Sequence, residues 1–189
     1  SRWLSARLTN FFEICPDLSL KIESINSIDE FSKANFSIAI LWGDGWSDFE
    51  YELLMSSSSY ILGNRKIYDQ TKSLSLEEAM KKTPLLSDGF YGGHGGMKAW
   101  HKTANLEYKP SKSSLTITDA FTRLQAVIDG QGIALWDELV DEEIKSGKLF
   151  YISDIELQGF GYHLVYKNKN ALSIEEQKFR KWIKGVLQK

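Results

Sequence analysis

Short strand patterns alternate with amphipathic helix patterns along this chain, and this alternation constrains the fold more than any other feature. In the stretch LQAVIDGQGIALW (124–136), a helical run ends in Gly-Gln-Gly and an apolar strand pattern follows at once. Gly130 can close the helix with a positive φ, and Gly132 lets the chain turn into a buried strand. SIAILW (37–42) is a near-continuous apolar run, which is typical of a parallel strand buried on both faces. Strands that alternate with helices predict an α/β fold.

Capping signals mark the starts of two predicted helices. Ser75 with Glu78, and Ser173 with Glu176, have the spacing of capping boxes. The helices expected from the periodicity cover 2–13, 28–34, 76–82, 97–103, 119–128, a run from 137 to an αL cap expected at Gly147, and the stretch after 173. The expected strands cover 18–25, 37–42, 49–56, 58–63, 113–118, 132–136, 148–152 and 161–167.

Length and charge limit the class of protein. The 189 residues fit one domain or one bilobed unit of two small lobes. The formal net charge of -2 argues against direct binding of nucleic acid by this chain, because such domains are usually basic on one face. Cys15 is the only cysteine, so an internal disulfide is excluded and a cytoplasmic location is favoured. No apolar run reaches about 18 residues, so no membrane span is expected.

The start of the chain suggests that it is part of a longer protein. SRWLSARLTNFFEI lacks the apolar stretch of a signal peptide and begins directly with a helix. A parallel α/β sheet normally has a strand before its first helix, so we expect a fragment of a longer chain.

Nucleophile elbows, Walker loops and H-E-x-x-H motifs are absent from the sequence. His94, His101 and His163 do not fall at metal-ligand spacing. We therefore expect no catalysis, no metal and no cofactor.

Three motifs occur in one order and at one spacing that resembles a known family. They are SRWLSARLTNF with CPDLSLKIE near the start, AILWGDGW in the middle, and TDAFTRLQAVIDGQGIAL later. Together they resemble the effector-binding domain of LysR-type transcriptional regulators, most closely the branch that includes the glycine-cleavage activator and the β-lactamase-gene activator. The likeness is strongest over 1–54 and 116–136.

The resemblance implies a type-2 periplasmic-binding-protein fold, in which two Rossmann-like lobes with mixed sheets flank a cleft. Residues 1–58 would form the first part of lobe I, residues 59–161 lobe II, and residues 162–189 the return to lobe I. The chain would cross between the lobes near 56–60 and 160–163. The family's N-terminal winged helix-turn-helix and the strand before its first helix are absent from this chain.

Helix N-termini supply the first set of expected ligand contacts. Free backbone N–H groups and the positive end of the helix dipole favour an anionic group, and such ends occur here at Ser1 and at Thr118 with Asp119. The family resemblance places effector contacts at these positions. Thr and Asp are also ordinary N-caps, so plain capping is an equally open interpretation.

A second set of expected contacts lies at strand ends and in a glycine-rich loop. Gly43 and Asp44 follow the strand 37–42, where Asp44 could pair with a ligand amine or simply serve a turn. The resemblance puts an effector-contacting aromatic at Tyr162, which could otherwise pack in the core. Tyr91, in GFYGGHGG (89–96), could line the cleft or lie on a surface loop. Asp44 and Asp119 together suggest a small zwitterionic effector such as an amino acid or a short peptide-like molecule.

The resemblance also implies a homodimer, with a tetramer in the full-length protein. The first helix and the strand 18–25 of one chain would pack against helix 119–129 of the other, with Arg7, Phe11, Phe12 and Gln125 at the interface. DNA would be bound only through the missing N-terminal domain. The expected function is a cytoplasmic ligand-sensing regulatory domain. A periplasmic solute-binding protein of a transporter is the first alternative, and a small α/β enzyme is the second.

Overall fold

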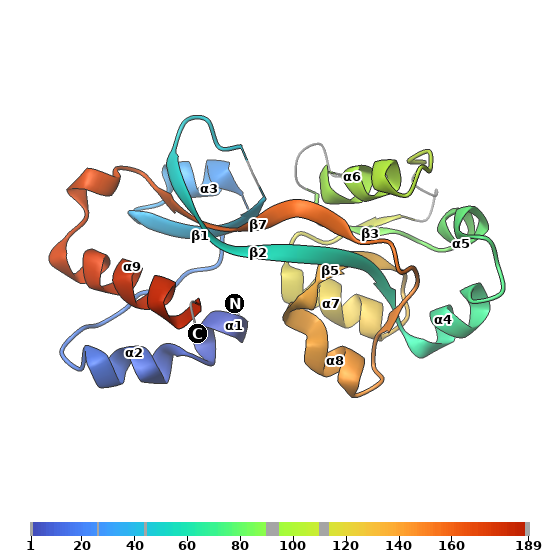
Figure 1. Ribbon diagram of the computed structural model, residues 1–189, viewed down its shortest axis with the longest axis horizontal. Helices are drawn as coiled ribbons and strands as arrows, with labels where there is room; N and C mark the ends of the chain where they lie inside the picture. Colours follow the sequence, from blue (N-terminus) through green and yellow to red (C-terminus); the bar gives the residue numbers. More distant parts are fainter. Residues whose placement is uncertain (1, 26, 44, 90–94, 110–113, 188–189) are drawn as a thin grey trace. The chain divides into compact units, whose positions relative to one another are not determined.

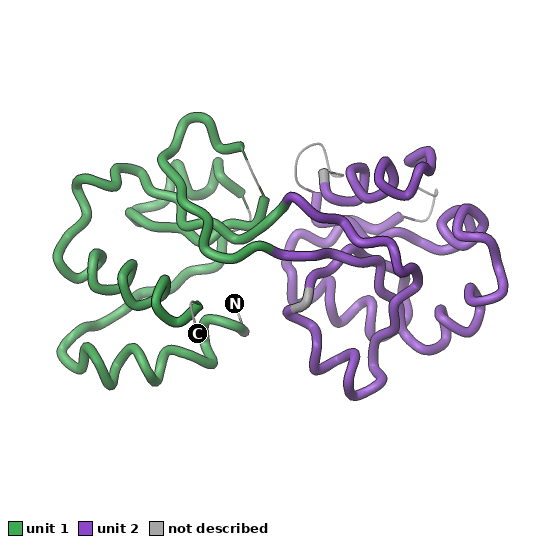
Figure 2. Tube along the Cα trace, in the orientation of Figure 1, with its two compact units in different colours: residues 1–56, 160–189 green, residues 57–159 purple. Residues whose placement is uncertain are grey.

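The computed structural model describes residues 2–25, 27–43, 45–89, 95–109 and 114–187 (Figure 1). The chain divides into two compact units: unit 1 comprises Ser1–Ser56 with Phe160–Lys189, and unit 2 comprises Ser57–Gly159 (Figure 2). It leaves unit 1 along β2 (Glu50–Gly63) and returns along β7 (Leu157–Tyr166). The boundaries expected from the sequence, 58/59 and 161/162, fall within these same two strands.

Unit 1 has helices on both faces of its sheet (Figure 1). Its elements are α1 (Arg2–Ser5), α2 (Leu8–Ile14), α3 (Ile28–Lys33), β1 (Ile38–Gly43), the start of β2, the end of β7, a 3-10 helix (Lys169–Ala171) and α9 (Ile174–Leu187). β1 pairs antiparallel with β7, and β7 lies beside β2. Successive residues of a strand point to opposite faces, so Leu164 joins the core under α2 and α9 whereas Val165 joins the core under α3.

Unit 2 is built around a second core. Its elements are the end of β2, α4 (Arg65–Thr71), α5 (Leu76–Lys82), β3 (Leu86–Ser87), α6 (Gly95–Thr103), β4 (Leu115–Thr116), α7 (Ala120–Ile128), β5 (Ala134–Asp137), a 3-10 helix (Glu138–Val140), α8 (Asp141–Lys145), β6 (Phe150–Tyr151) and the start of β7. β5 and β6 pair antiparallel with β2, while β3 and β4 pair in parallel. Leu62, Leu86, Leu124 and Val127 are among the buried residues of this core.

Both predicted capping boxes are confirmed. At the start of α5, the Ser75 Oγ accepts a hydrogen bond from the Glu78 N–H at 3.3 Å, and the Ser75 N–H donates to the Glu78 Oε2 at 3.3 Å. At the start of α9, the Glu176 N–H donates to the Ser173 Oγ at 3.2 Å, and the Ser173 N–H donates to the Glu176 Oε2 at 2.7 Å. Each box provides acceptors for two backbone N–H groups that a helix start would otherwise leave without a partner.

The two glycines of Gly-Gln-Gly are both required by the backbone. Gly130 has a φ of 79°, the left-handed conformation expected of a residue that ends a helix. A Cβ on Gly132 would lie 2.4 Å from the Pro84 carbonyl oxygen, so only glycine fits where the chain enters the strand beside Pro84. Next to this point, Leu85 forms a parallel bridge with Ile133.

The predicted strand 18–25 is not a strand in the structure. Leu18 and Leu20 pack on the unit 1 core as the alternating pattern predicts, but no described strand forms a ladder with this segment. A strand exists only where a neighbour supplies its hydrogen bonds. Among the described strands, β1 pairs with β7 alone, so the alternation sets the burial of 18–25 without giving it a partner.

The predicted helix 2–13 is interrupted between α1 and α2. In a continuous helix the Trp3 carbonyl would accept the Arg7 backbone N–H. Here the Arg7 guanidinium donates to that carbonyl at 3.0 Å, and the Arg7 N–H bonds instead to the Leu4 carbonyl at 3.0 Å. The side chain therefore competes with the backbone for the same acceptor, and the helix turns at Arg7.

Several further elements differ from the prediction. The strand 37–42, expected to be parallel and buried on both faces, corresponds to β1, which pairs antiparallel with β7 and is only partly buried. The pattern over 113–118 yields only the two-residue β4, and the two strands expected over 49–56 and 58–63 are one continuous β2. Helix α4 is not among the elements predicted from the sequence. The sequence feature that could have predicted this helix is Asn64, whose Oδ1 caps α4 by accepting the Ile67 N–H at 3.0 Å.

Candidate functional site

The unit 1 part of the expected site lies where β1 ends. Gly43 pairs with Gly161, and Trp42 lies opposite Tyr162. Gly43 has a φ of 133°, and a Cβ on Gly161 would lie 2.6 Å from the Met55 carbonyl oxygen, so the backbones approach closely here. Ser1 and Asp44, the other two contacts expected in this unit, lie outside the described residues.

Aromatic rings surround this end of the sheet, and sequence analysis missed two of them. Trp42 and Phe160 stack at 4.9 Å between ring centroids with an interplanar angle of 10°. Strand alternation puts Trp42, Phe160 and Tyr162 on one face of the β1–β7 pair, and all three are half-buried. Trp42 could have been found from its position directly before the expected Gly43. Stacked, partly exposed rings offer an apolar surface beside the expected ligand contacts.

The unit 2 part of the expected site lies at the N-terminus of α7. Thr118 and Asp119 are both exposed. The Asp119 Oδ1 accepts the Thr122 N–H at 2.8 Å and the Thr122 hydroxyl at 2.7 Å, and these hydrogen bonds lower the pKa of Asp119. Asp119 is therefore a charged N-cap. Tyr91, the other contact expected in this unit, lies outside the described residues.

Hydroxyl groups gather next to Thr118. The Ser87 Oγ and the Thr116 Oγ1 lie 3.2 Å apart, at the carboxyl ends of the parallel strands β3 and β4. A Cβ on Gly89 would lie 2.9 Å from the Thr116 Cγ2, so the loop after β3 passes close to β4. Ligands of open α/β sheets bind beyond the carboxyl ends of parallel strands, and this arrangement supplies hydroxyl donors and a helix N-terminus there.

The expected interface residues have different surroundings. Phe11 is fully buried and packs against Phe179 and Trp182, so this side chain belongs to the unit 1 core and does not reach a partner. Phe12 is 39% exposed. The Arg7 guanidinium lies 4.5 Å from the centroid of the Trp3 ring.

On the expected partner helix α7, the exposed face carries more than Gln125. The Gln125 side chain donates to the Asp129 Oδ1 at 2.8 Å. Phe121, one helical turn earlier, is 49% exposed and was missed by sequence analysis. The helical spacing could have identified Phe121 as exposed, because Leu124 and Val127 lie on the buried face of α7.

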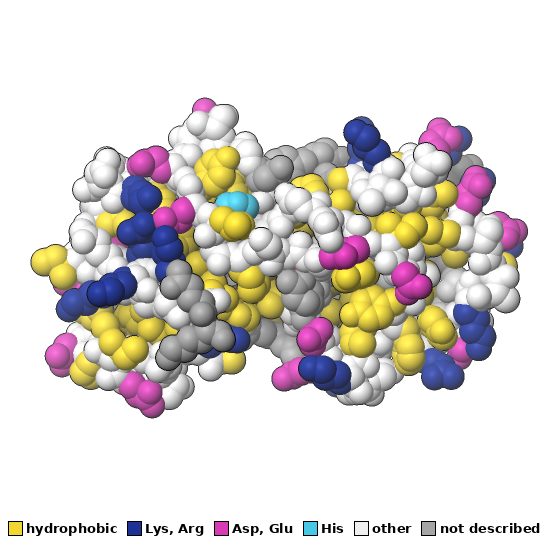
Figure 3. Space-filling model, in the orientation of Figure 1, with side chains coloured by type: hydrophobic (Ala, Val, Ile, Leu, Met, Phe, Trp, Pro, Cys, Tyr) yellow, Lys and Arg dark blue, Asp and Glu magenta, His cyan; other side chains and the backbone are white. Residues whose placement is uncertain are grey.

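A cation cluster in unit 1 is structural. The Glu52 carboxylate accepts the Arg180 Nε at 2.6 Å and the Lys184 Nζ at 3.0 Å, and the Lys169 Nζ lies 3.6 Å away. The hydrogen bond from Arg180 is the main cause of a pKa of Glu52 well below its usual range. Figure 3 shows dark blue lysine and arginine side chains gathered over the part of unit 1 that holds α9. Because this carboxylate is satisfied by its own chain, the cluster ties α9 to β2.

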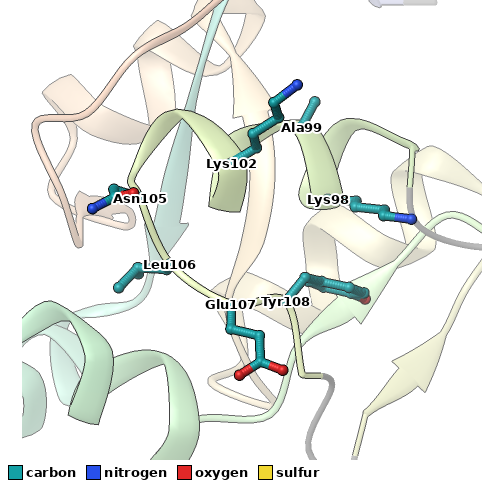
Figure 4. Close-up of a pocket in the computed structure, with 7 residues that line it drawn as sticks. All are labelled: Lys98, Ala99, Lys102, Asn105, Leu106, Glu107 and Tyr108. Atoms are coloured by element: carbon teal, nitrogen blue, oxygen red, sulfur yellow. The ribbon is translucent and has the colours of Figure 1, made fainter.

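A hollow of about 710 Å³ lies in unit 2 between the end of α6 and the segment after it. In Figure 4 the charged ends of Lys98, Lys102 and Glu107 point in different directions, so they do not converge on one point. The Glu107 carboxylate pairs with Lys109 at 2.6 Å. Ligand sites need a few converging polar groups, which this hollow lacks.

The described histidines are packed among other side chains of their own units. The His101 Nδ1 lies 2.8 Å from the Met97 carbonyl oxygen, and burial lowers the pKa of His101. His163 packs edge-on against Trp46 and Tyr51. Within the described ranges there is no group of three or more side chains that could hold a metal ion, and no helix there is long and apolar enough to cross a membrane. His94 lies outside these ranges.

Comparison with known proteins identifies relatives over nearly the whole chain. A family model described as LysR substrate binding domain matches residues 1–188. The glycine cleavage system transcriptional activator homolog of Haemophilus influenzae is 23% identical over 188 residues, covering 96% of this chain and 60% of that protein. The HTH-type transcriptional regulator BlaA of Proteus vulgaris is 24% identical over 186 residues, covering 96% and 60% respectively.

A solved structure shows the same fold. The effector domain of the transcriptional regulator AmpR of Pseudomonas aeruginosa matches with a TM-score of 0.84 at 20% identity, over 98% of this chain and 89% of that one. The chain itself spans about 60% of the length of the two curated relatives above.

Proposed function

Because this chain belongs to the LysR substrate-binding domain family, we propose that it senses a small effector for DNA-binding domains carried by a longer protein. The curated relatives that it matches are named as transcriptional regulators. This favours a regulator over the solute-binding protein of a transporter, which the sequence alone leaves open. The DNA contact, a dimer or tetramer, and a cytoplasmic location are part of the same proposal, because the chain spans only part of its relatives.

The observation that carries effector binding is the group of donors at the carboxyl ends of β3 and β4. The Ser87 and Thr116 hydroxyls lie 3.2 Å apart there, and α7 begins directly after Thr118 and Asp119. Backbone N–H groups at a helix N-terminus bind carboxylates, and hydroxyls add further donors. We propose that Thr118 contacts a carboxylate of the effector.

The charge of Asp119 limits which effectors can bind beside Thr118. Asp119 is exposed and held in its charged form, so it opposes a simple dianion but suits an ammonium group. Asp44 adds a second carboxylate in the proposal. The effector is therefore zwitterionic, and Gly43 and Tyr162 of unit 1, together with Ser1 and Tyr91, complete its proposed contacts.

Calorimetric titration tests this proposal. Wild-type protein is titrated with the twenty common amino acids and with succinate and glutarate as dicarboxylates. We expect at least one amino acid to bind, and Asp44→Ala to weaken it about ten- to a hundredfold, because a charge-assisted hydrogen bond contributes about 1.5–3 kcal/mol.

A matched variant controls for charge alone. Asp154 is exposed, so Asp154→Ala removes one negative charge from unit 2 and should leave the affinity unchanged. Tight binding of a dicarboxylate that is indifferent to Asp44→Ala would contradict the zwitterionic effector.

A further inference from the structure

A groove of about 840 Å³ lies within unit 1 and is lined by α2, the turn that follows it and α9. Figure 1 shows where these two helices lie in unit 1. Its apolar lining includes Ile14, Leu18, Trp182 and Val186. The Trp182 Nε1 donates to the Asn10 Oδ1 at 3.0 Å, which fixes the indole as one wall of the groove. The volume lies in the range of small-molecule sites, which are about 300–1,000 Å³ and mostly apolar.

The charged residues that line the groove are mostly cations. Arg7, Lys178 and Lys181 contribute three positive charges, against one negative charge from Asp17. The Arg7 guanidinium is already positioned by its hydrogen bond to the Trp3 carbonyl at 3.0 Å. Neither lysine forms an ion pair or hydrogen bond with any residue that the structure describes, in contrast to Lys184 on the same helix, which pairs with Glu52. The groove therefore combines an apolar lining with a net positive charge, which Asp17 and the nearby Glu175 carboxylate offset only in part.

A glycine inside α9 keeps the groove open. Gly185 lies within the helix and lines the groove, and a Cβ at this position would meet no atom within 4 Å. Glycine weakens a helix interior relative to alanine. Neither a positive φ nor a close neighbour requires glycine here, so packing does not explain it. A larger side chain would occupy the free space above the helix.

We propose that this groove binds an organic anion that carries an apolar chain or ring. The apolar part lies along Ile14, Trp182 and Val186, and the anionic group pairs with Lys178 and Lys181. The proposal does not depend on the effector site described above, because the residues that line the groove belong to unit 1 and none of the described effector contacts, Gly43, Thr118, Asp119 and Tyr162, is among them.

Isothermal titration with n-decanoate below its micellar concentration tests the groove. Decyltrimethylammonium serves as the matched cationic probe, and acetate as the probe without an apolar chain. We expect saturable one-to-one binding of decanoate only. Equal binding of the cationic probe, or absence of decanoate binding to a folded protein, overturns the proposal.

Two kinds of variant locate the binding. The double variant Lys178→Gln with Lys181→Gln should weaken decanoate binding at least about tenfold, since it removes both charge-assisted contacts. Gly185→Leu should abolish binding while the circular dichroism spectrum and the melting temperature stay at or above wild type. Lys66→Gln, an exposed lysine of unit 2, should change nothing. An affinity for decanoate that ignores the first two variants overturns the proposal.

A second copy of the chain is the competing occupant, because Arg7 is also an expected interface residue. Sedimentation velocity of wild type and Gly185→Leu, with and without decanoate, separates the two. A groove that binds ligand leaves the association state of both proteins the same. A dimer that dissociates on Gly185→Leu or on addition of decanoate would assign the groove to an interface and overturn the proposal.

Discussion

At the scale of single residues, Glu52 joins β2 to the C-terminal segment through one carboxylate. Its side chain is 17% exposed, and Arg180, Lys184, Lys169 and the Tyr166 hydroxyl all surround it. Sequence analysis did not identify this cluster, because its members are more than a hundred residues apart from Glu52 and only the fold brings them together. Local signals such as the Ser75 cap were predictable, because both partners lie within three residues.

Glu52→Gln should lower the free energy of unfolding by about 2 kcal/mol at neutral pH, since it leaves three cations without their shared carboxylate. Urea denaturation followed by circular dichroism measures this change. Glu13→Gln, an exposed position on α2, is the matched control and should be neutral. A Glu52→Gln protein as stable as wild type would show that solvent replaces the carboxylate without cost.

The same cluster predicts a pH dependence. The pKa of Glu52 is lowered in the folded state from its usual 4.5, mainly by the hydrogen bond from Arg180. The stabilisation is therefore complete above about pH 4.5 and is lost as the pH falls through the folded pKa, because the unfolded state then binds the proton more readily. Between pH 5 and pH 3 wild type should lose stability more steeply than Glu52→Gln. Parallel curves for the two proteins would contradict this assignment.

At the scale of elements, the sequence predicts what depends on neighbours along the chain and misses what depends on neighbours in space. The start and end of α5 match the prediction at both bounds, because a capping box and helical periodicity are local. Residues 18–25 show the opposite case, since their alternation is real but a ladder needs a partner strand. The surroundings of α7 follow the same division: the N-cap Asp119 was predictable from a local pattern, whereas the contact between Ser87 and Thr116 required the parallel pairing of β3 with β4.

The start of α7 allows capping and ligand binding by Asp119 to be separated. Asp119→Ala should destabilise the protein by about 1 kcal/mol, whereas Asp119→Asn should cost only a few tenths, because Asn is an equally good N-cap. If the carboxylate also pairs with an effector ammonium, both variants should weaken binding of the amino acid found by titration. Denaturation and calorimetry on the same two proteins give both readouts. Full affinity in Asp119→Asn would leave Asp119 with capping alone.

At the scale of the whole molecule, the ordered motifs predicted more than any local pattern could. The family and the type-2 periplasmic-binding-protein fold predicted from them are confirmed by the family model over residues 1–188 and by the AmpR effector domain. Spacing between motifs records the topology, which single elements do not. Effector contacts and partner surfaces remain proposals, because they depend on exposed side chains such as Thr118 and Phe12, for which burial imposes no pattern.

The proposed homodimer gives the last prediction, because its two surfaces each carry an exposed aromatic ring. Phe12 on α2 is 39% exposed and Phe121 on α7 is 49% exposed, so a partner that covers the exposed part would gain about 1 kcal/mol for each ring. We expect wild type to sediment as a dimer at tens of micromolar, and Phe12→Asp or Phe121→Asp to raise the dissociation constant at least about tenfold. Ile174→Asp is the matched control, since Ile174 is 68% exposed at the start of α9 and lies outside the expected interface. Wild type that sediments as a monomer, or a control that dissociates the dimer as strongly as the two phenylalanine variants, would show that α2 and α7 do not form the pairing surface.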